Sequence, residues 1–374
     1  MIMKRTLLVA TTSYAGMGPY ASEIINSFTK NDNLFFFLRE YEDNYYHCNI
    51  KKELIPFCFF YKRYNTHINT LYDLFLPDLI FINKILKVCK DNDIIQIHYL
   101  NELPSSFVIR HFSSKGIKIL GTVHDLCPHE AKKVFYKMIK HKISSYHLSK
   151  SLIVCKNIIT NERSQFETLI NRFPNKNVYF HSFPSLITDS IKEGNQIPVE
   201  ISNIKGTYIL FFGRFEKYKG ISLLYNAFIS TPELYDNYTL VVAGKGELDF
   251  ENNSDKVVII NRYIQDSEIK MLYSKAKCVV YPYISGTQSG VLSLAFYFKL
   301  PVLVSDIPMF KTVIEESMAG LSFQARNLDN LKEQLIKIVS TDTSHFKLNA
   351  ELYYKSHYNK EAIRQTLLSI YHNL

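Results

Sequence analysis

The sequence lacks the patterns that mark membrane-spanning, disulfide-rich or metal-binding proteins. No apolar stretch approaches the ~20 residues of a membrane-spanning helix. The six cysteines form no Cys-x-x-Cys pair, and most lie in apolar segments, which favours buried free thiols in a reducing cytosol. Histidine, cysteine and aspartate show no metal-ligand spacing. The short apolar run after Arg5 predicts a buried strand rather than a signal peptide. We therefore expect a soluble or peripheral protein that needs no metal.

Acidic side chains are too few to balance the basic ones. The chain has 35 Asp and Glu against 44 Lys and Arg, a net charge of +9 and a pI near 9.0. This excess suggests an anionic partner such as phosphate groups, an acidic membrane surface or nucleic acid, although solvated lysines alone would also explain it. The 26 Tyr and 26 Phe fall mostly in core-like runs without a nucleic-acid-binding motif, so nucleic acid is the least favoured partner.

Length and periodicity predict two α/β domains. A chain of 374 residues exceeds the size at which one core usually keeps growing. Short apolar runs alternate with helical patterns, which indicates parallel sheets covered on both faces. The expected strands are Leu7–Ala10, Leu34–Leu38, Ile94–His98, Ile117–Val123, Leu152–Val154, Val178–Phe180, Tyr208–Phe212, Leu240–Ala243, Val257–Ile260, Cys278–Tyr281 and Val302–Val304.

We expect a doubly wound, Rossmann-like domain over 1–200 and another over 205–355, facing one another across a central cleft. The stretch 192–206 lacks a sustained period and is predicted as the linker. Residues 356–374 are expected to form a helix that packs back on the first domain. Ligands of such domains bind at the C-terminal ends of the strands.

Several motifs of the second half follow predicted strands. Gly213 and Arg214 end one strand, and Lys219 precedes a helix, where Arg and Lys can bind an anion. Gly244 follows another strand and permits close backbone approach; the full Gly-x-Gly-x-x-Gly is absent, and an ordinary turn is an equal alternative. A third strand leads into a helix start that offers unpaired N–H groups and hydroxyls to a phosphate, or simply an N-cap. That helix start consists of Thr287, Gln288, Ser289 and Gly290.

These motifs, in this order, resemble the retaining family 4 glycosyltransferases, two-domain GT-B enzymes that use nucleotide-activated sugars. The resemblance is close over the second half and loose over the first. It implies that Arg214 and Lys219 bind the donor diphosphate and Thr287–Gly290 its distal phosphate. It further implies that the segment Asn261–Ile264, with Arg262 and Ile264, contacts the nucleobase through main-chain atoms. Retention and independence from metal are also implied.

Two positions depart from the family pattern. The family commonly has two glutamates eight positions apart, where this chain has Gly286 and Leu294. The resemblance therefore implies altered contacts to the donor sugar and ribose; a branch with Thr-Gln-Ser-Gly in this loop looks similar. A further departure is Lys311, where Glu is frequent. The alternatives are a nucleotide-sugar 2-epimerase, which the missing carboxylates disfavour, and a non-catalytic glycan- or nucleotide-binding subunit.

The first half carries less specific signals. Gly16 and Gly18 lie between the first strand and a helix, and resemble a loop that faces donor and acceptor. His98 and His124 each end a buried strand, where a hydrogen-bonded core histidine is the usual explanation. The family places a donor-sugar contact in the context of His124, which we predict as catalytic beside Arg214 and Lys219, with the adjacent aspartate orienting its ring.

The segment 132–150 is rich in lysine and has apolar residues at helical spacing. It predicts either an ordinary surface helix or a basic amphipathic helix that contacts an anionic membrane. The expected function is transfer of a hexose from a nucleotide sugar to a glycan or lipid-linked acceptor, in bacterial surface polysaccharide synthesis (O-antigen or capsule). The expected place is the cytoplasmic face of the membrane.

Overall fold

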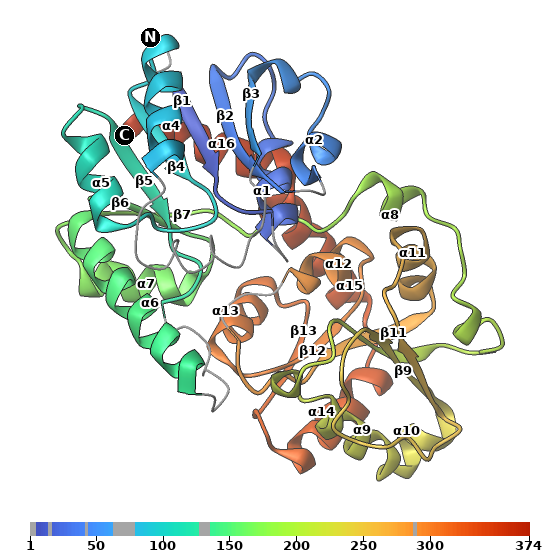
Figure 1. Ribbon diagram of the computed structural model, residues 1–374. Coiled ribbons are helices and arrows are strands. Elements are labelled where there is room, and N and C mark those ends of the chain that lie inside the picture. Colours follow the sequence, from blue (N-terminus) through green and yellow to red (C-terminus); the bar gives the residue numbers. More distant parts are fainter. Residues whose placement is uncertain (1–4, 14–16, 42–43, 63–78, 127–134, 287–289) are drawn as a thin grey trace. The chain divides into compact units, whose positions relative to one another are not determined.

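Two parallel β-sheets organise the chain (Figure 1). The structure is a computed structural model that describes residues 5–13, 17–41, 44–62, 79–126, 135–286 and 290–374; within 135–144 only the backbone is described. Internal contacts divide the chain into two units. Unit 1 consists of Met1–Pro184 with Lys360–Leu374, and unit 2 of Ser185–Asn359.

The sheet of unit 1 contains seven strands among the described residues, in the order β3-β2-β1-β4-β5-β6-β7, and every pairing is parallel. Its strands are β1 (Thr6–Ala10), β2 (Leu34–Glu40), β3 (Cys58–Lys62), β4 (Gln96–Tyr99), β5 (Lys118–Thr122), β6 (Asn157–Thr160) and β7 (Asn177–Phe180). Its helices are α1 (Met17–Ile25), α2 (Tyr45–Asn49), α4 (Leu79–Asp91), α5 (Ser106–Ser113), α6 (Phe135–Val154), α7 (Arg163–Arg172) and α16 (Lys360–Asn373), with the 3-10 turn η1 (Ile55–Phe57).

Successive residues of β1 enter two different cores, because side chains alternate across a strand. Leu8 and Ala10 join the cluster formed with α1, α2 and α16. Leu7 and Val9 join the cluster formed with α4, α5 and α7. A strand buried on both faces must be apolar at consecutive positions, which is why β1 is a continuous apolar run.

The C-terminal helix α16 belongs to unit 1, where it lies beside α1 (Figure 1). Leu367 and Tyr371 are fully buried in the core, and the Tyr371 carbonyl accepts from Gln96 Nε2 at 2.9 Å. Arg364 Nε donates to the Asp32 carboxylate at 2.8 Å. This ion pair lowers the pKa of Asp32 although partial burial opposes it.

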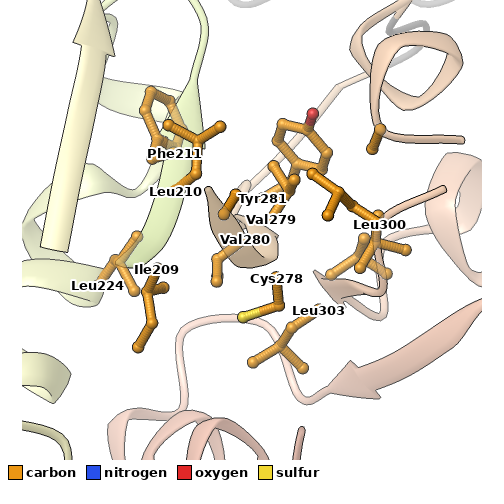
Figure 2. Close-up of a cluster of buried hydrophobic side chains, with 14 of the residues drawn as sticks. Ile209, Leu210, Phe211, Leu224, Cys278, Val279, Val280, Tyr281, Leu300 and Leu303 are labelled. Carbon is orange, nitrogen blue, oxygen red and sulfur yellow. The ribbon is translucent and has the colours of Figure 1, made fainter. Parts of the chain in front are cut away.

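The sheet of unit 2 has the order β10-β9-β8-β11-β12-β13 and is likewise parallel. Figure 2 shows its core, where β8 and β11 supply side chains that are almost fully buried and Leu224 of the following helix packs beside them. The strands are β8 (Tyr208–Phe212), β9 (Thr239–Gly244), β10 (Val257–Asn261), β11 (Ala276–Tyr281), β12 (Val302–Ser305) and β13 (Gly320–Phe323).

Among the helices of unit 2, α9, α10 and α14 contact one another, and α15 contacts both α12 and α13. Their bounds, with those of the remaining helical segments, are α8 (Asp189–Glu193), η2 (Val199–Ile201), η3 (Lys217–Lys219), α9 (Ile221–Ile229), α10 (Pro232–Asn237), α11 (Asp266–Ser274), α12 (Val291–Tyr297), α13 (Pro308–Ser317), α14 (Leu328–Ser340), α15 (Ser344–Tyr353) and the π-helical turn η4 (Tyr354–Tyr358).

One predicted strand is wrong. Leu152–Val154 forms the end of α6, where Leu152 is buried while Ile153 is 66% exposed, and the strand β6 begins only at Asn157. The stretch 192–206, predicted as a linker, packs on unit 2: Gln196 N donates to the Ser267 carbonyl at 3.1 Å. The division between the units falls before it, at Pro184 and Ser185.

Candidate functional site

The loop that follows β8 is packed against the segment that follows β11. Gly220 has a φ of +65°, in the left-handed region, and a Cβ there would lie 2.0 Å from the Pro282 carbonyl oxygen. Ile284 N donates to the Tyr218 carbonyl at 2.7 Å. The two loops therefore lie together at the carboxyl edge of adjacent strands, where parallel α/β sheets bind ligands.

Arg214 lies in this loop with its side chain 73% exposed. Its Nη1 is 3.1 Å from Oε1 of Glu216, which orients the guanidinium without burying it. A guanidinium that remains open to solvent retains N–H donors for an incoming anion.

Lys219 contrasts with Arg214, because only 7% of it is exposed. Its Nζ lies 3.8 Å from the ring centre of Tyr283 and 4.9 Å from that of Tyr218. Burial lowers the pKa of Lys219 to about 7, the nearby Arg214 lowers it further, and Glu216 opposes the shift. The loop thus pairs an exposed cation with a buried one.

Gly244 is a glycine because two backbones meet there. Its φ is +155°, and a Cβ would lie 1.8 Å from the Gly213 carbonyl oxygen. Phe215 N donates to the Lys245 carbonyl at 2.9 Å, so the loops after β8 and β9 run side by side. The close approach that the sequence predicts for Gly244 is made, at least in part, by the chain itself.

Gly286, in the segment between β11 and α12, and Leu294, within α12, occupy the two positions where the resemblance predicts glutamates. A Cβ on Gly286 would lie 2.9 Å from Sδ of Met309. Leu294 is 1% exposed and belongs to the core of unit 2. Gly290 begins α12, and its carbonyl accepts from the Ser293 hydroxyl at 2.6 Å. The predicted phosphate ligands Thr287, Gln288 and Ser289 lie outside the described residues.

Arg262, predicted near the nucleobase, is an ion-pair centre. Its guanidinium bonds both oxygens of Glu200 at 2.8 and 3.0 Å and both oxygens of Glu268 at 2.7 Å. The hydrogen bonds lower the pKa of both carboxyls and raise that of Arg262. This side chain fixes the β10–α11 connection, and Ile264 beside it is buried. The main-chain role of the segment stays a prediction.

In unit 1, His124 follows β5 and is 9% exposed. Its Nε2 lies 3.0 Å from the Leu100 carbonyl, which can only accept, so this nitrogen carries a proton. The Leu100 carbonyl is thus an orienting group that no side-chain pattern predicts, and the orienting role suggested for Asp125 stays a prediction. Gly18 lies buried in α1, where a Cβ would meet the Ser13 carbonyl at 2.6 Å. Gly16 lies outside the described residues.

His98 is a core histidine. It is fully buried, with Nδ1 2.7 Å from the Tyr371 hydroxyl and Nε2 3.1 Å from the Thr122 hydroxyl. The Thr122 hydroxyl donates its proton to the Tyr99 carbonyl at 2.6 Å, so Nε2 of His98 must be the donor to the Thr122 oxygen. Burial keeps the pKa of His98 well below 6.5, so the ring is neutral.

Sequence reasoning missed two further polar residues at this edge. His181 directly follows β7, and its Nε2 lies 3.0 Å from the Tyr20 hydroxyl of α1. Its Nδ1 donates to the Ser182 carbonyl at 2.9 Å. The Tyr20 ring meets the His124 ring edge to face at 4.8 Å. The position of His181 at a strand end was the signal that could have found it; Tyr20 had none.

We predict that unit 1 loses stability as the pH falls from 6.5 to 4. Burial, aided by the nearby His124, lowers the pKa of His181 to about 4 from 6.5, so in this window the unfolded chain binds a proton that the folded chain does not. The expected loss from His181 alone is roughly 3 kcal/mol. Urea titrations at several pH values measure it. His181→Gln should flatten the dependence, whereas the exposed His147→Gln should not; equal slopes in the two variants would contradict the assignment.

Helix α6 covers most of the basic segment 132–150. In its second half Tyr146 and Ile153 are 60% and 66% exposed, and Lys150 Nζ lies 5.4 Å from the Tyr146 ring centre. No helix within the described ranges is long and apolar enough to cross a membrane. Nor does this part of the chain gather three His, Cys, Asp or Glu side chains into a possible metal site.

Comparison with known proteins finds similarity to glycosyltransferases. Residues 194–356 match the model of a family described as glycosyl transferases group 1. The chain is also 26% identical over 204 residues to the O-antigen chain mannosyltransferase RfbU of Salmonella typhimurium. That alignment covers 52% of this chain and 53% of the relative, so the chain spans about half the length of the curated relative it matches.

Solved structures extend the likeness to the whole chain. Anabaena HepE in complex with UDP-glucose superposes with a TM-score of 0.69 at 15% identity, covering 99% of this chain and all of that one. WaaG, a glycosyltransferase of lipopolysaccharide biosynthesis, gives a TM-score of 0.62 at 14% identity over 98% and 99% of the two chains. The fold is that of GT-B glycosyltransferases. The predicted pair of Rossmann-like, parallel-sheet domains is thereby confirmed.

The residues predicted for the donor diphosphate lie within the matched stretch 194–356. Gly213, Arg214, Lys219 and Gly244 come together at the carboxyl ends of β8 and β9, beside the segment that follows β11. Arg262 and Ile264 follow β10 at the edge of the same sheet.

Proposed function

We propose that this protein is a glycosyltransferase that moves a hexose from a nucleotide diphosphate sugar to a glycan or lipid-linked acceptor, with retention at the anomeric carbon. The observation that carries the proposal is the pair Arg214 and Lys219, one open and one buried, on a glycine-bounded loop at the carboxyl edge of a parallel sheet. Two cations at such an edge suit a diphosphate.

The compared proteins support the donor and the setting. The solved structure of HepE contains UDP-glucose, which favours a nucleotide sugar as co-substrate. The names of RfbU and WaaG refer to O-antigen and lipopolysaccharide, which favours bacterial surface polysaccharide as the product. We place the reaction at the cytoplasmic face of the membrane on this basis.

The proposed chemistry breaks the bond between the anomeric carbon and the diphosphate oxygen. The acceptor hydroxyl oxygen forms the new bond on the same face, and its proton passes to the departing phosphate. Arg214 and Lys219 stabilise the negative charge that grows on the leaving diphosphate, together with the residues Thr287–Gly290 that precede α12 in the sequence. These groups supply the positive charge themselves, so we propose transfer without a metal ion.

His124 is proposed as a contact to the donor sugar. Its Nε2 donates to the Leu100 carbonyl, which fixes the orientation of the ring at the carboxyl end of β5. Gly16, which precedes α1 in the sequence, and Gly18, in the first turn of α1, are proposed as part of the donor-binding region. The Asn261–Ile264 segment is proposed to contact the nucleobase through its main chain.

The test is turnover of a panel of UDP, GDP and ADP sugars, with and without EDTA, in the presence of extracted lipid-linked glycans. Release of nucleoside diphosphate and a glycosylated acceptor is the expected result. Binding without release in every mixture would favour a non-catalytic subunit, and interconversion of the nucleotide sugar alone would favour an epimerase. Loss of turnover in EDTA would contradict the metal-free reaction.

We also propose that α6 contacts an anionic membrane. Tyr146, Lys150 and Ile153 recur at helical spacing and are all exposed, an apolar and basic stripe suited to a bilayer interface. The lysines of 132–150 would add attraction to anionic lipids.

Lys150→Ala with Ile153→Ala is expected to weaken binding to phosphatidylglycerol vesicles by more than tenfold. The lost cation contributes about 1 kcal/mol and the lost apolar contact ~1.5 kcal/mol. Vesicle sedimentation measures the partition coefficient. Ile170→Ala, an exposed isoleucine on α7, is the matched control. Equal binding of the double variant and the wild type would overturn the membrane proposal.

A further inference from the structure

The amine of Lys219 lies between two tyrosine rings. Its ammonium group lies against the faces of Tyr283 and Tyr218, whose rings meet edge to face at 6.1 Å. Among the described residues, no carboxylate forms an ion pair or hydrogen bond with Nζ. A buried cation without an acidic partner is costly, so part of the population loses the proton instead.

The two rings are held from different sides. Tyr283 is 1% exposed, and its ring packs on that of Phe310 with 5.0 Å between the ring centres. The Ser305 hydroxyl donates to the Tyr283 carbonyl at 2.6 Å. Tyr218 lies in η3, the same turn as Lys219. Its carbonyl accepts a hydrogen bond from Ile284 N, in the segment that follows β11. Lys219 therefore rests between a fixed ring and a ring on its own loop.

We propose that Tyr218 and Tyr283 are positioning residues that hold Lys219 in an aromatic cage as a partly neutral amine, and that binding of the donor diphosphate loads one proton onto it. This rests on the proposed function, because the diphosphate is the anion that the loop is taken to bind. The proton comes from a buffer acid in the solvent: its bond to the buffer breaks, an N–H bond forms on Nζ, and the buffer base remains in solution.

Charged groups around the amine set the direction of this coupling. Burial and Arg214 lower the pKa of Lys219 to about 7, whereas Glu216 raises it. Tyr218 and Tyr283 face the amine with their rings, and burial raises the pKa of Tyr218, so its hydroxyl stays neutral. Lys217 on the same turn is exposed. A diphosphate beside the amine adds negative charge and raises its pKa, so uptake grows as the pH rises above 7.

The experiment is calorimetric titration of the full chain with UDP-glucose, or with GDP-mannose if UDP-glucose does not bind. Neither sugar nucleotide has a phosphate that titrates near pH 7. Comparing two buffers of different ionisation enthalpy gives the number of protons taken up. We expect almost none at pH 6 and close to one at pH 8, with affinity falling nearly tenfold per pH unit above 7.

Variants distinguish the effect of the tyrosine rings from the effect of the positive charge at position 219. Lys219→Arg keeps the cation and should bind without proton uptake, because arginine stays protonated. Tyr218→Leu should hydrate the amine and reduce uptake at pH 8 by more than half while binding persists. Lys217→Arg, the exposed neighbour, should behave as the wild type. Binding by the wild type at pH 8 with no uptake would overturn the cage.

A second measurement needs no ligand. Nitrogen-15 NMR of the empty protein should place the midpoint of the Lys219 amine near pH 7, and a midpoint close to that of Lys217 would also overturn the inference. If the amine titrates near pH 7 but no nucleotide sugar binds, the proposed function fails and the coupling fails with it, whereas the cage itself stands.

Discussion

Arg214→Ala is expected to lower kcat/KM for the nucleotide sugar by about two orders of magnitude, the usual effect of removing one group that stabilises a developing anion. The free energy of unfolding should change by less than about 1 kcal/mol, because Arg214 is 73% exposed and its ion pair with Glu216 lies at the surface. A large kinetic loss with an unchanged fold is the signature of a ligand-binding side chain.

Steady-state release of nucleoside diphosphate and urea unfolding measure the two quantities. Arg214→Lys retains a charge but not the planar fork, so an intermediate loss is expected. Lys217→Ala removes a charge from the same loop and should change kcat/KM by less than threefold. If both alanine variants lose activity equally, the effect comes from net charge rather than from the position of Arg214, and the diphosphate assignment is wrong.

The most clearly predicted strands are central ones that are buried on both faces. Tyr208–Phe212, Leu240–Ala243 and Cys278–Tyr281 are uninterrupted apolar runs, and the alternation of such runs with helices was sufficient to predict parallel sheets. β3 was missed because it is an edge strand whose residues are only partly buried or exposed. β13 begins with glycine, and β6 has only two apolar residues after a helix end. In these three strands the apolar run is too short or too exposed to stand out, whereas β7, also at an edge, was predicted from Val178–Phe180.

Some features of the candidate site could likewise be predicted from the local sequence, and others could not. Arg214 and Lys219 are close in sequence, so their loop could be predicted without knowing the fold. The contact of Tyr283 with Lys219 depends on β8 and β11 being neighbours, which no local pattern encodes. His98 and His124 occupy equivalent strand ends, and only the Tyr371 hydroxyl of the distant C-terminal helix identifies His98 as a core residue.

Leu294→Glu, which introduces the residue that the family resemblance predicts at this position, is expected to destabilise the protein by about 4 kcal/mol at pH 8. Leu294 is 1% exposed on α12 within the apolar core of unit 2, so a carboxylate there would lose its hydration without gaining a partner. The resemblance to the family therefore does not extend to a ribose-contacting carboxylate at this site.

Urea unfolding of the variants compares charge, polarity and size. Leu294→Met conserves volume and should cost under about 1.5 kcal/mol, whereas Leu294→Gln isolates the cost of burying a polar group. Burial would raise the pKa of the new glutamate, so the folded variant binds a proton at a higher pH than the unfolded chain does. The free energy of unfolding of Leu294→Glu should therefore approach that of Leu294→Gln as the pH falls from 8 to 5. A stable Leu294→Glu protein with tighter nucleotide-sugar binding would show instead that position 294 faces the ligand, and that Leu294 marks a changed donor site rather than a core residue.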